Sequence, residues 1–253
     1  MTALAAVVLG TAAGCGTAAG TMLPSAPSTP SPAASSVPPS RPAKPPAAAR
    51  ITYPEAGGGD WAIAPAQTTP AAGQGGRRMR YRVAVERDIR GLPVTAFAST
   101  VTATLADPRG WTAGGRWRLL RVGPGDPYDF TIYLATPDTR DELCAGGRDG
   151  YTSCRNGASV VLNVARWVKG VPDYGAGLAT YRQYMVNHEV GHRLGNGHER
   201  CPGPGKPAPV MQQQTLGLHG CAGNPWPYVD GERYAGRSGT YDDPTPPRDR
   251  GSR

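Results

Sequence analysis

The sequence predicts an α+β fold, because segments with the alternation of strands occur together with two segments of helical periodicity. Tyr81, Val83 and Val85 alternate with less apolar residues, which predicts a half-buried strand at the start of the folded part. Further strands are expected at 116–122, 129–135 and 158–167. No internal repeat and no apolar run of membrane-spanning length interrupts this pattern.

Two helices are expected. The first lies between Pro93, which suits a first helical turn, and Asp107, which precedes a proline. The second runs from about residue 178 to Gly195, and it carries a stripe of apolar residues and histidines at helical spacing: Leu178, Tyr181, Met185, His188 and His192. Beyond Arg200 the chain is rich in proline and glycine, which predicts an irregular C-terminal part.

Composition divides the chain into four parts. Residues 22–76 are dominated by Pro, Ala, Ser, Thr and Gly, which predicts a disordered linker. The folded domain is expected at 77–230, and residues 231–253 are expected to form a disordered tail.

Residues 1–21 resemble an export signal or the start of a lipoprotein, in which Cys15 would be lipidated and would anchor the chain to a membrane. No basic residue precedes the apolar run, which an upstream start codon would explain, and Ala12 stands where a lipoprotein signal usually has leucine. The alternative is a cytoplasmic chain with an alanine-rich start.

The four remaining cysteines form two local pairs in sequence. We expect the disulfides Cys144–Cys154 and Cys201–Cys221, although four cysteines allow three pairings. A zinc site built from all four is the competing interpretation, but no C-x-x-C spacing occurs. Disulfides favour an extracellular or cell-envelope location.

The net charge of +8 comes mostly from arginines that are scattered through loops and the tail. Nucleic-acid binding would require basic residues gathered on one element with interleaved aromatic residues, so we expect no nucleic-acid partner. A solvated surface, or one that faces an anionic envelope, accounts for the charge. We expect a monomer.

Three of the four histidines lie within eleven positions, in "HEVGHRLGNGH". His188 and His192 are four residues apart on a helix, so both imidazoles can reach one ion, and Glu189 lies beside them. Gly195 can adopt a left-handed conformation that ends the helix and brings His198 back as a third ligand. Three neutral imidazoles leave Zn²⁺ its full charge and one open position for water.

This segment matches the H-E-x-x-H-x-x-G-x-x-H motif and so resembles the metzincin zinc metalloproteases. The resemblance implies a zincin-like fold with a small twisted mixed sheet, an active-site helix and a Met-turn, for which "APVMQQQT" supplies Met211. It also implies that Glu189 is the general base of peptide hydrolysis. The segment 181–227, which includes "NPWP", is similar to an uncharacterised family of secreted actinobacterial proteins, and the resemblance extends over residues 77–230.

The chain departs from the metzincins at Gln213, where some of them have a tyrosine that stabilises the transition state. Tyr181, Tyr184 and Tyr228 are the candidate substitutes. We expect substrate to pair with an edge strand at 158–164, and residues 199–210 to form a wall of the cleft. His219, the fourth histidine, is expected to be structural.

The expected function is a secreted or envelope-anchored zinc metallopeptidase acting on a polypeptide. One alternative is a catalytically weak, zinc-stabilised module that binds envelope components, against which Glu189 argues, because a metal scaffold needs only ligands. A second alternative is a zinc hydrolase of a non-peptide amide, such as a cell-wall cross-link.

Overall fold

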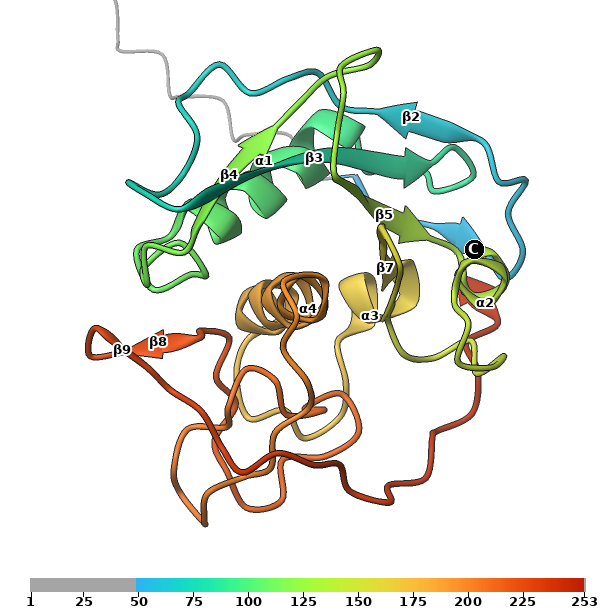
Figure 1. Cartoon of the computed structure of the whole chain (residues 1–253). Helices are drawn as coiled ribbons and strands as arrows, with labels where there is room; N and C mark the ends of the chain where they lie inside the picture. The colour runs from blue at the N-terminus through green and yellow to red at the C-terminus, as the bar shows by residue number, and fades with distance from the viewer. Residues whose placement is uncertain (1–48, 253) are drawn as a thin grey trace, which may run out of the picture. The chain divides into compact units, whose positions relative to one another are not determined.

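The computed structural model describes residues 49–252, which belong to one compact unit. Cys15, the export signal and the first part of the predicted linker lie outside the described residues. The fold is α+β, as predicted, and its centre is a mixed sheet in the strand order β2-β3-β5-β7-β6, with β4 paired to β3 (Figure 1).

The sheet is parallel in its middle and antiparallel at both ends. β3 (Arg77–Glu86) pairs in parallel with β4 (Trp117–Arg121) and β5 (Phe130–Ala135), and β5 pairs in parallel with β7 (Ser159–Asn163). β2 (Trp61–Ile63) and β6 (Cys154–Asn156) are antiparallel to their neighbours. These antiparallel strands make the sheet mixed, and β6 is an edge strand.

Helices α1 (Val94–Ala106) and α4 (Leu178–Arg193) confirm the two predicted helices. Both contribute to the large core on one face of the sheet, where Phe97 meets Trp167 of α3 (Val164–Lys169) edge to face. The short helix α2 (Pro137–Leu143) was not predicted, and it packs near the smaller cluster around Val161. The core therefore holds α4 firmly against the sheet.

The prediction of a strand over 158–167 is wrong in its second half. β7 ends at Asn163, and Val164 begins α3. The Asn163 side chain accepts a hydrogen bond from the Ala165 backbone N–H at 2.9 Å, which caps the helix. A short apolar run has no periodicity that separates strand from buried helix, so the cap decides where the strand ends.

The folded part extends beyond the predicted 77–230 on both sides. Within the segment predicted as linker, β1 (Tyr53–Pro54) and β2 are ordered and Ala64 is fully buried. Within the predicted tail, β10 (Gly251–Ser252) pairs with β1. These segments are held mainly by hydrogen bonds and ion pairs. Such contacts do not require the apolar periodicity of a core element, and the sequence therefore did not reveal that the segments are folded.

Ion pairs fasten this C-terminal segment to the domain. Asp249 accepts hydrogen bonds from Tyr53, Arg166 and Lys169, and Arg248 pairs with Glu55, Asp138 and Asp141. The tail thus ties the N-terminal strand to α2 and α3.

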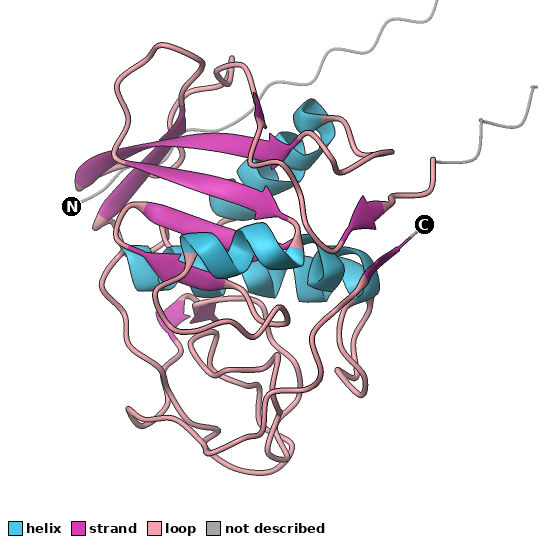
Figure 2. Ribbon diagram, turned by 90° about the vertical axis from the view of Figure 1, so that its right-hand side faces the viewer, coloured by secondary structure: helices cyan, strands magenta, loops and turns pink. Residues whose placement is uncertain are grey.

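The C-terminal part is irregular, as predicted, with only β8 (Tyr228–Val229) and β9 (Glu232–Arg233) as a small hairpin between α4 and β10. It lies on the side of α4 away from the sheet, and Figure 2 shows it as loops below the helices. The Cys201–Cys221 disulfide crosslinks it, and Cys144–Cys154 joins the end of α2 to β6, so both predicted pairings are confirmed.

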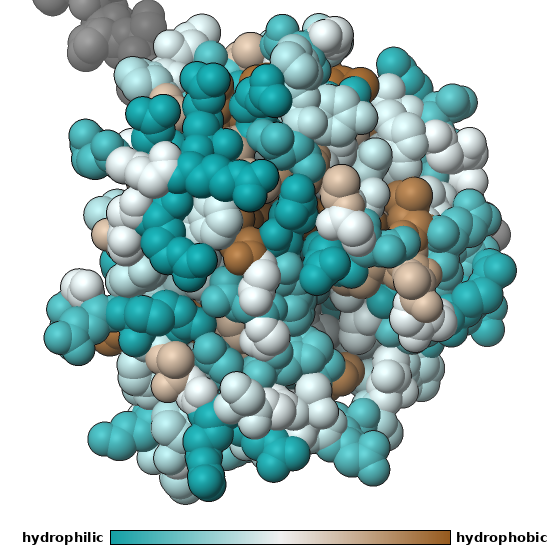
Figure 3. Space-filling model, in the orientation of Figure 1, coloured by the Kyte–Doolittle hydropathy of each residue, from teal (hydrophilic) through white to brown (hydrophobic). Residues whose placement is uncertain are grey.

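The two disulfides point to a location outside the cytoplasm. Among the described residues, no helix has both the length and the apolar character that crossing a bilayer demands. The face shown in Figure 3 is mostly hydrophilic, with apolar residues in small separate patches. Tyr128 and Leu178 are the large apolar side chains that are exposed within the described part.

Candidate metal centre

Helix α4 places His188, Glu189 and His192 beside a cavity that the edge strand β6 also lines. His188 and Glu189 are buried and His192 is half-buried. The two histidine rings lie edge to face with centroids 4.7 Å apart, as the i, i+4 spacing on one helix face requires.

Gly195 turns the chain so that His198 reaches the same space. Its φ of 95° lies in the left-handed region, where a side chain would be strained. The Asn196 backbone N–H and side-chain amide both donate to the Gly191 carbonyl at 3.0 Å, which closes the helix end. The His198 ring then stacks on His188 with centroids 5.5 Å apart.

Backbone carbonyls fix the tautomers of the two helical histidines. Nδ1 of His188 lies 2.8 Å from the Val210 oxygen, and Nδ1 of His192 lies 2.9 Å from the Asn196 oxygen. Because a carbonyl can only accept, each Nδ1 carries the proton, and each Nε2 has a free lone pair.

The three Nε2 atoms converge. His192 Nε2 lies 3.2 Å from His188 Nε2 and 3.0 Å from His198 Nε2. Nitrogens that share a tetrahedral zinc ion are about 3.3 Å apart, given a Zn–N distance of about 2.05 Å. His188, His192 and His198 could therefore bind a metal ion.

Burial suits these side chains to metal binding. Burial lowers the pKa of His188 and His192, and it lowers that of His198 to about 4, with His192 adding to the effect. All three imidazoles are then neutral near pH 7, which is the form that binds a metal.

Glu189 faces the same space with an unsatisfied carboxylate. Its Oε2 atom is buried and has no hydrogen-bond partner among residues 49–252. Burial raises the pKa of Glu189 to about 8, and the charges of Arg140 and Arg155 oppose this rise. A buried acceptor without a donor is costly, so it indicates that another group belongs beside it.

Met211 lies beneath α4 in a tight turn, in which the Gln212 N–H donates to the Pro209 carbonyl at 2.9 Å. Met211 is fully buried, and its Sδ atom reaches so close to Gly191 that a side chain there would overlap it. The residue before Met211 is Val210, whose carbonyl holds His188. The turn thus supports the first histidine from below.

A cavity of about 290 Å³ opens beside the three Nε2 atoms. The three histidines and Glu189 line it together with residues 152–155 and Tyr184, and with Gln213, Thr215 and Leu216 from the chain after the turn.

The predicted walls of the cleft are wrong. The edge strand is β6, because β7 is covered by β5 on one side and β6 on the other. None of residues 199–210 lines the cavity, since pairings such as Ala208 N–H to the Ala222 carbonyl fold this segment onto the 220s. The hairpin signal Asn156-Gly157 could have revealed β6 and with it Arg155, which sequence analysis missed.

The three tyrosines proposed as substitutes occupy different places. Tyr184 lines the cavity but donates its hydroxyl to the Gln212 carbonyl at 3.0 Å, and Tyr181 bonds Thr215 at 2.9 Å. Burial raises the pKa of both phenols. Tyr228 is not among the cavity residues, and Gln213 is.

His219 also lies outside this cavity. Its Nε2 atom is 2.8 Å from a carboxylate oxygen of Asp243, and its ring stacks on Tyr241. The fourth histidine therefore joins the C-terminal segment to the loop that follows the Met211 turn.

Fold and site together define an α+β protein with a three-histidine group that could hold a metal ion. The chain belongs to the DUF3152 family, which is described as a family of proteins of unknown function and whose profile matches residues 47–229. The match begins before β1 and includes all three histidines. No curated protein and no solved structure matches the chain.

Proposed function

We propose that the protein is a secreted or envelope-anchored zinc metallopeptidase of metzincin type. The observation that carries the proposal is the convergence of three Nε2 atoms, in which that of His192 lies 3.2 Å from that of His188 and 3.0 Å from that of His198. The same cavity holds the carboxylate of Glu189, whose Oε2 atom has no partner among the described residues. Three neutral nitrogen ligands and an open side are typical of catalytic zinc rather than structural zinc.

His188, His192 and His198 would hold the zinc. When bound, zinc supplies a Lewis acid that makes water nucleophilic near neutral pH and polarises the carbonyl to be attacked. The two helical histidines keep their orientation because the Val210 and Asn196 carbonyls hold their Nδ1 protons.

Glu189 would act as the general base. Its carboxylate would take a proton from the attacking water and return it to the leaving amine. Its burial favours this role, because a carboxylate whose pKa is raised toward neutrality both accepts and releases a proton near pH 7.

The free edge of β6 would bind the substrate backbone. Asn156 and Ser159 close the β6–β7 hairpin around Gly157, so Arg155, one position along, is a non-hydrogen-bonded pair with Val160. The N–H and C=O of Arg155 then point away from β7, toward the free edge. An extended peptide can pair with them while its side chains enter the cavity.

The test uses the whole chain, because β1 and β2 belong to the fold. Zinc content and casein cleavage are measured on the parent, on Glu189→Gln and on the control Glu142→Gln, whose carboxylate is exposed on α2. We expect about one zinc per chain in all three, with cleavage lost only in Glu189→Gln, by at least about a hundredfold.

The outcomes separate the alternatives. Zinc in every variant without cleavage by any of them would favour the envelope-binding module or a non-peptide substrate. Absence of zinc from the purified parent, after exposure to a zinc buffer, would refute the metal centre itself.

A further inference from the structure

Strand β6 directs one arginine toward the metal centre. Cys154 lies opposite Val161 and Arg155 lies opposite Val160. Val161 belongs to the small cluster near α2, whereas Val160 belongs to the core on the face that α4 covers. Because directly opposite residues of an antiparallel pair project to the same face, the Arg155 side chain lies on the α4 side of the sheet.

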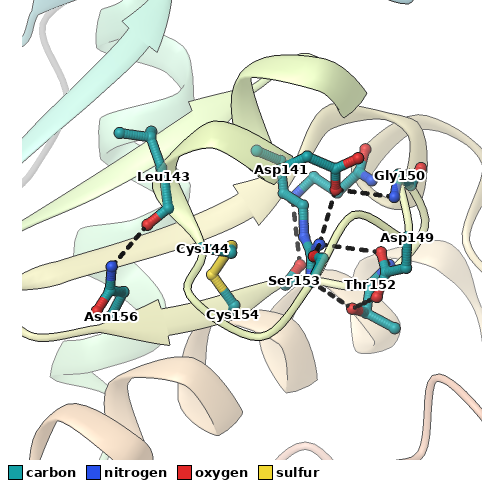
Figure 4. The surroundings of a disulfide bond; sticks show 12 residues. Asp141, Leu143, Cys144, Asp149, Gly150, Thr152, Ser153, Cys154 and Asn156 are labelled. Carbon is teal, nitrogen blue, oxygen red and sulfur yellow. Dashed lines mark hydrogen bonds and ion pairs between the residues drawn. A yellow bond between two sulfur atoms is a disulfide. The ribbon is translucent and has the colours of Figure 1, made fainter.

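The neighbours of Arg155 hold this strand in place. Cys154 forms the disulfide with Cys144, and the Asn156 side-chain amide donates to the Leu143 carbonyl at 3.0 Å (Figure 4). Both contacts fix the opposite face of β6 to the end of α2. The residues before and after Arg155 are therefore both anchored to α2, which fixes the Arg155 backbone between them.

The Arg155 guanidinium has no anionic partner within residues 49–252, although the residue lines the cavity with Glu189 and His192. Arg155 is an exposed residue, so an anion that enters the cavity can reach its guanidinium, whereas Arg140 and Arg166 are buried and already paired with Asp141 and Asp249.

The rest of the cavity wall is suited to an anion. Glu189 is the single carboxylate among the cavity residues, and the Gln213 amide forms no side-chain hydrogen bond with described residues. The hydroxyls of Thr152, Ser153 and Thr215 in the wall already have partners. A guanidinium is always charged and offers paired N–H groups that match the two oxygens of a carboxylate. A carboxylate ligand could pair with the Arg155 guanidinium and accept a hydrogen bond from the Gln213 amide.

We propose that Arg155 binds a carboxylate of the substrate beside the bond that is cut, so that the enzyme selects acidic peptides. This inference rests on the proposed peptidase function and names its substrate class. Two groups of a peptide carry the same chemistry, an Asp or Glu side chain and the C-terminal carboxylate.

The test uses the whole zinc-loaded chain and quenched peptides that share one cleaved sequence. The peptides differ in two ways only. One position near the cut carries Glu or Gln, with a separate Glu and Gln pair for each such position, and the C-terminus is either a free acid or an amide. For the parent we expect kcat/KM to be about ten- to a hundredfold higher for the peptide that carries the recognised carboxylate than for its neutral counterpart. A preference seen only between Glu and Gln peptides identifies an acidic side chain as the ligand of Arg155. A preference seen only between acid and amide peptides identifies the C-terminal carboxylate.

Arg155→Gln should reduce the ratio between acidic and neutral peptides to about one, whereas Arg87→Gln, an exposed arginine outside the cavity, should retain the parental ratio. Arg155→Glu should reverse the preference toward peptides with Lys in the same position. An equal kcat/KM for acidic and neutral peptides in the parent, or a preference that survives Arg155→Gln, would overturn the inference while leaving the peptidase function intact.

If no peptide is cut by any variant, the peptidase function fails, and binding then tests Arg155 by itself. Dissociation constants of the fluorescent Glu peptide and its Gln counterpart are measured on zinc-loaded Glu189→Gln, with and without Arg155→Gln. Tighter binding of the Glu peptide that disappears with Arg155→Gln supports the anion site. Equal binding of the two peptides, or a preference unchanged by Arg155→Gln, refutes it.

Discussion

Adding a single methyl group at Gly191 should weaken both the fold and the metal centre. Gly191 lies in the last turn of α4, between the two helical histidines. A Cβ there would overlap the Sδ atom of Met211 and would lie 2.6 Å from Cζ2 of Trp111. Met211 is fully buried and the Trp111 indole donates to the Asn187 carbonyl at 2.8 Å, so neither side chain can move freely.

The magnitude follows from two opposing effects. Overpacking a rigid core by one carbon costs about 1–3 kcal/mol. Alanine gains back about 1 kcal/mol over glycine as a helix former. Because the added Cβ would overlap two buried side chains, the upper part of the first range applies, and Gly191→Ala should lower the free energy of unfolding by about 1–2 kcal/mol. An exposed helical glycine would instead gain stability.

Zinc binding should report the same displacement. Moving Met211 moves Val210, whose carbonyl holds Nδ1 of His188. Misorienting a ligand through its supporting hydrogen bond typically lowers metal affinity about ten- to a hundredfold. The assay is urea unfolding with EDTA present, followed by competition with a zinc chelator.

Gly197→Ala is the matched control. Gly197 lies in the same motif, has no atom within 4 Å of an added Cβ and has no positive φ. It should change the free energy of unfolding by less than about 0.5 kcal/mol. If Gly191→Ala is as stable as Gly197→Ala and binds zinc equally well, Met211 does not support the site in the way that the packing indicates.

Three further predictions follow from the same structure. Replacing Cys144 and Cys154 together by serine opens a loop of sequence separation 10 and should lower stability by about 2–3 kcal/mol; it should also speed amide exchange in β6, and unchanged exchange there would show that the disulfide does not hold the strand. Gly195→Ala should cost about 1–2 kcal/mol, because φ is 95° at that position, and an unaltered urea midpoint would contradict the strain. Burial acts to raise the pKa of Asp249, but hydrogen bonds from Lys169 and the Gly251 N–H outweigh it, so the pKa is lowered overall. A lowered carboxyl pKa stabilises the fold above about pH 4 and loses this effect as the pH falls further. Asp249→Asn should therefore be less stable than the parent at pH 7, and the difference should shrink below about pH 4 in urea unfolding; a constant difference from pH 7 to pH 3 would refute the ion-pair account.

The three-histidine group could be predicted from sequence because its geometry is local. A helix fixes His188 relative to His192 by spacing alone, and one glycine suffices to return His198. The disulfide pairings were accessible for the same reason, since both close short loops. The α+β class followed from periodicity, which survives wherever an element has one buried face.

The ends of the domain and the walls of the cleft depend on contacts between distant segments. Tyr53 and Asp249 are far apart in sequence and meet through a hydrogen bond, and neither lies in a periodic apolar segment. Composition therefore suggested a linker and a tail, although residues 49–76 and the segment around Asp249 belong to the fold. β6 was missed because a strand of three residues has too little sequence to show alternation, although its hairpin turn was visible.

The metal centre and the fold are coupled through one short path. Gly191 contacts Met211, the neighbouring Val210 carbonyl orients His188, and His188 shares the site with His192 and His198. A ligand that binds the three imidazoles only in their folded arrangement stabilises the whole domain by mass action. A metal ion bound there, the tight turn at Met211 and the packing of α4 would therefore reinforce one another, which gives a physical reason for the absence of a side chain at Gly191.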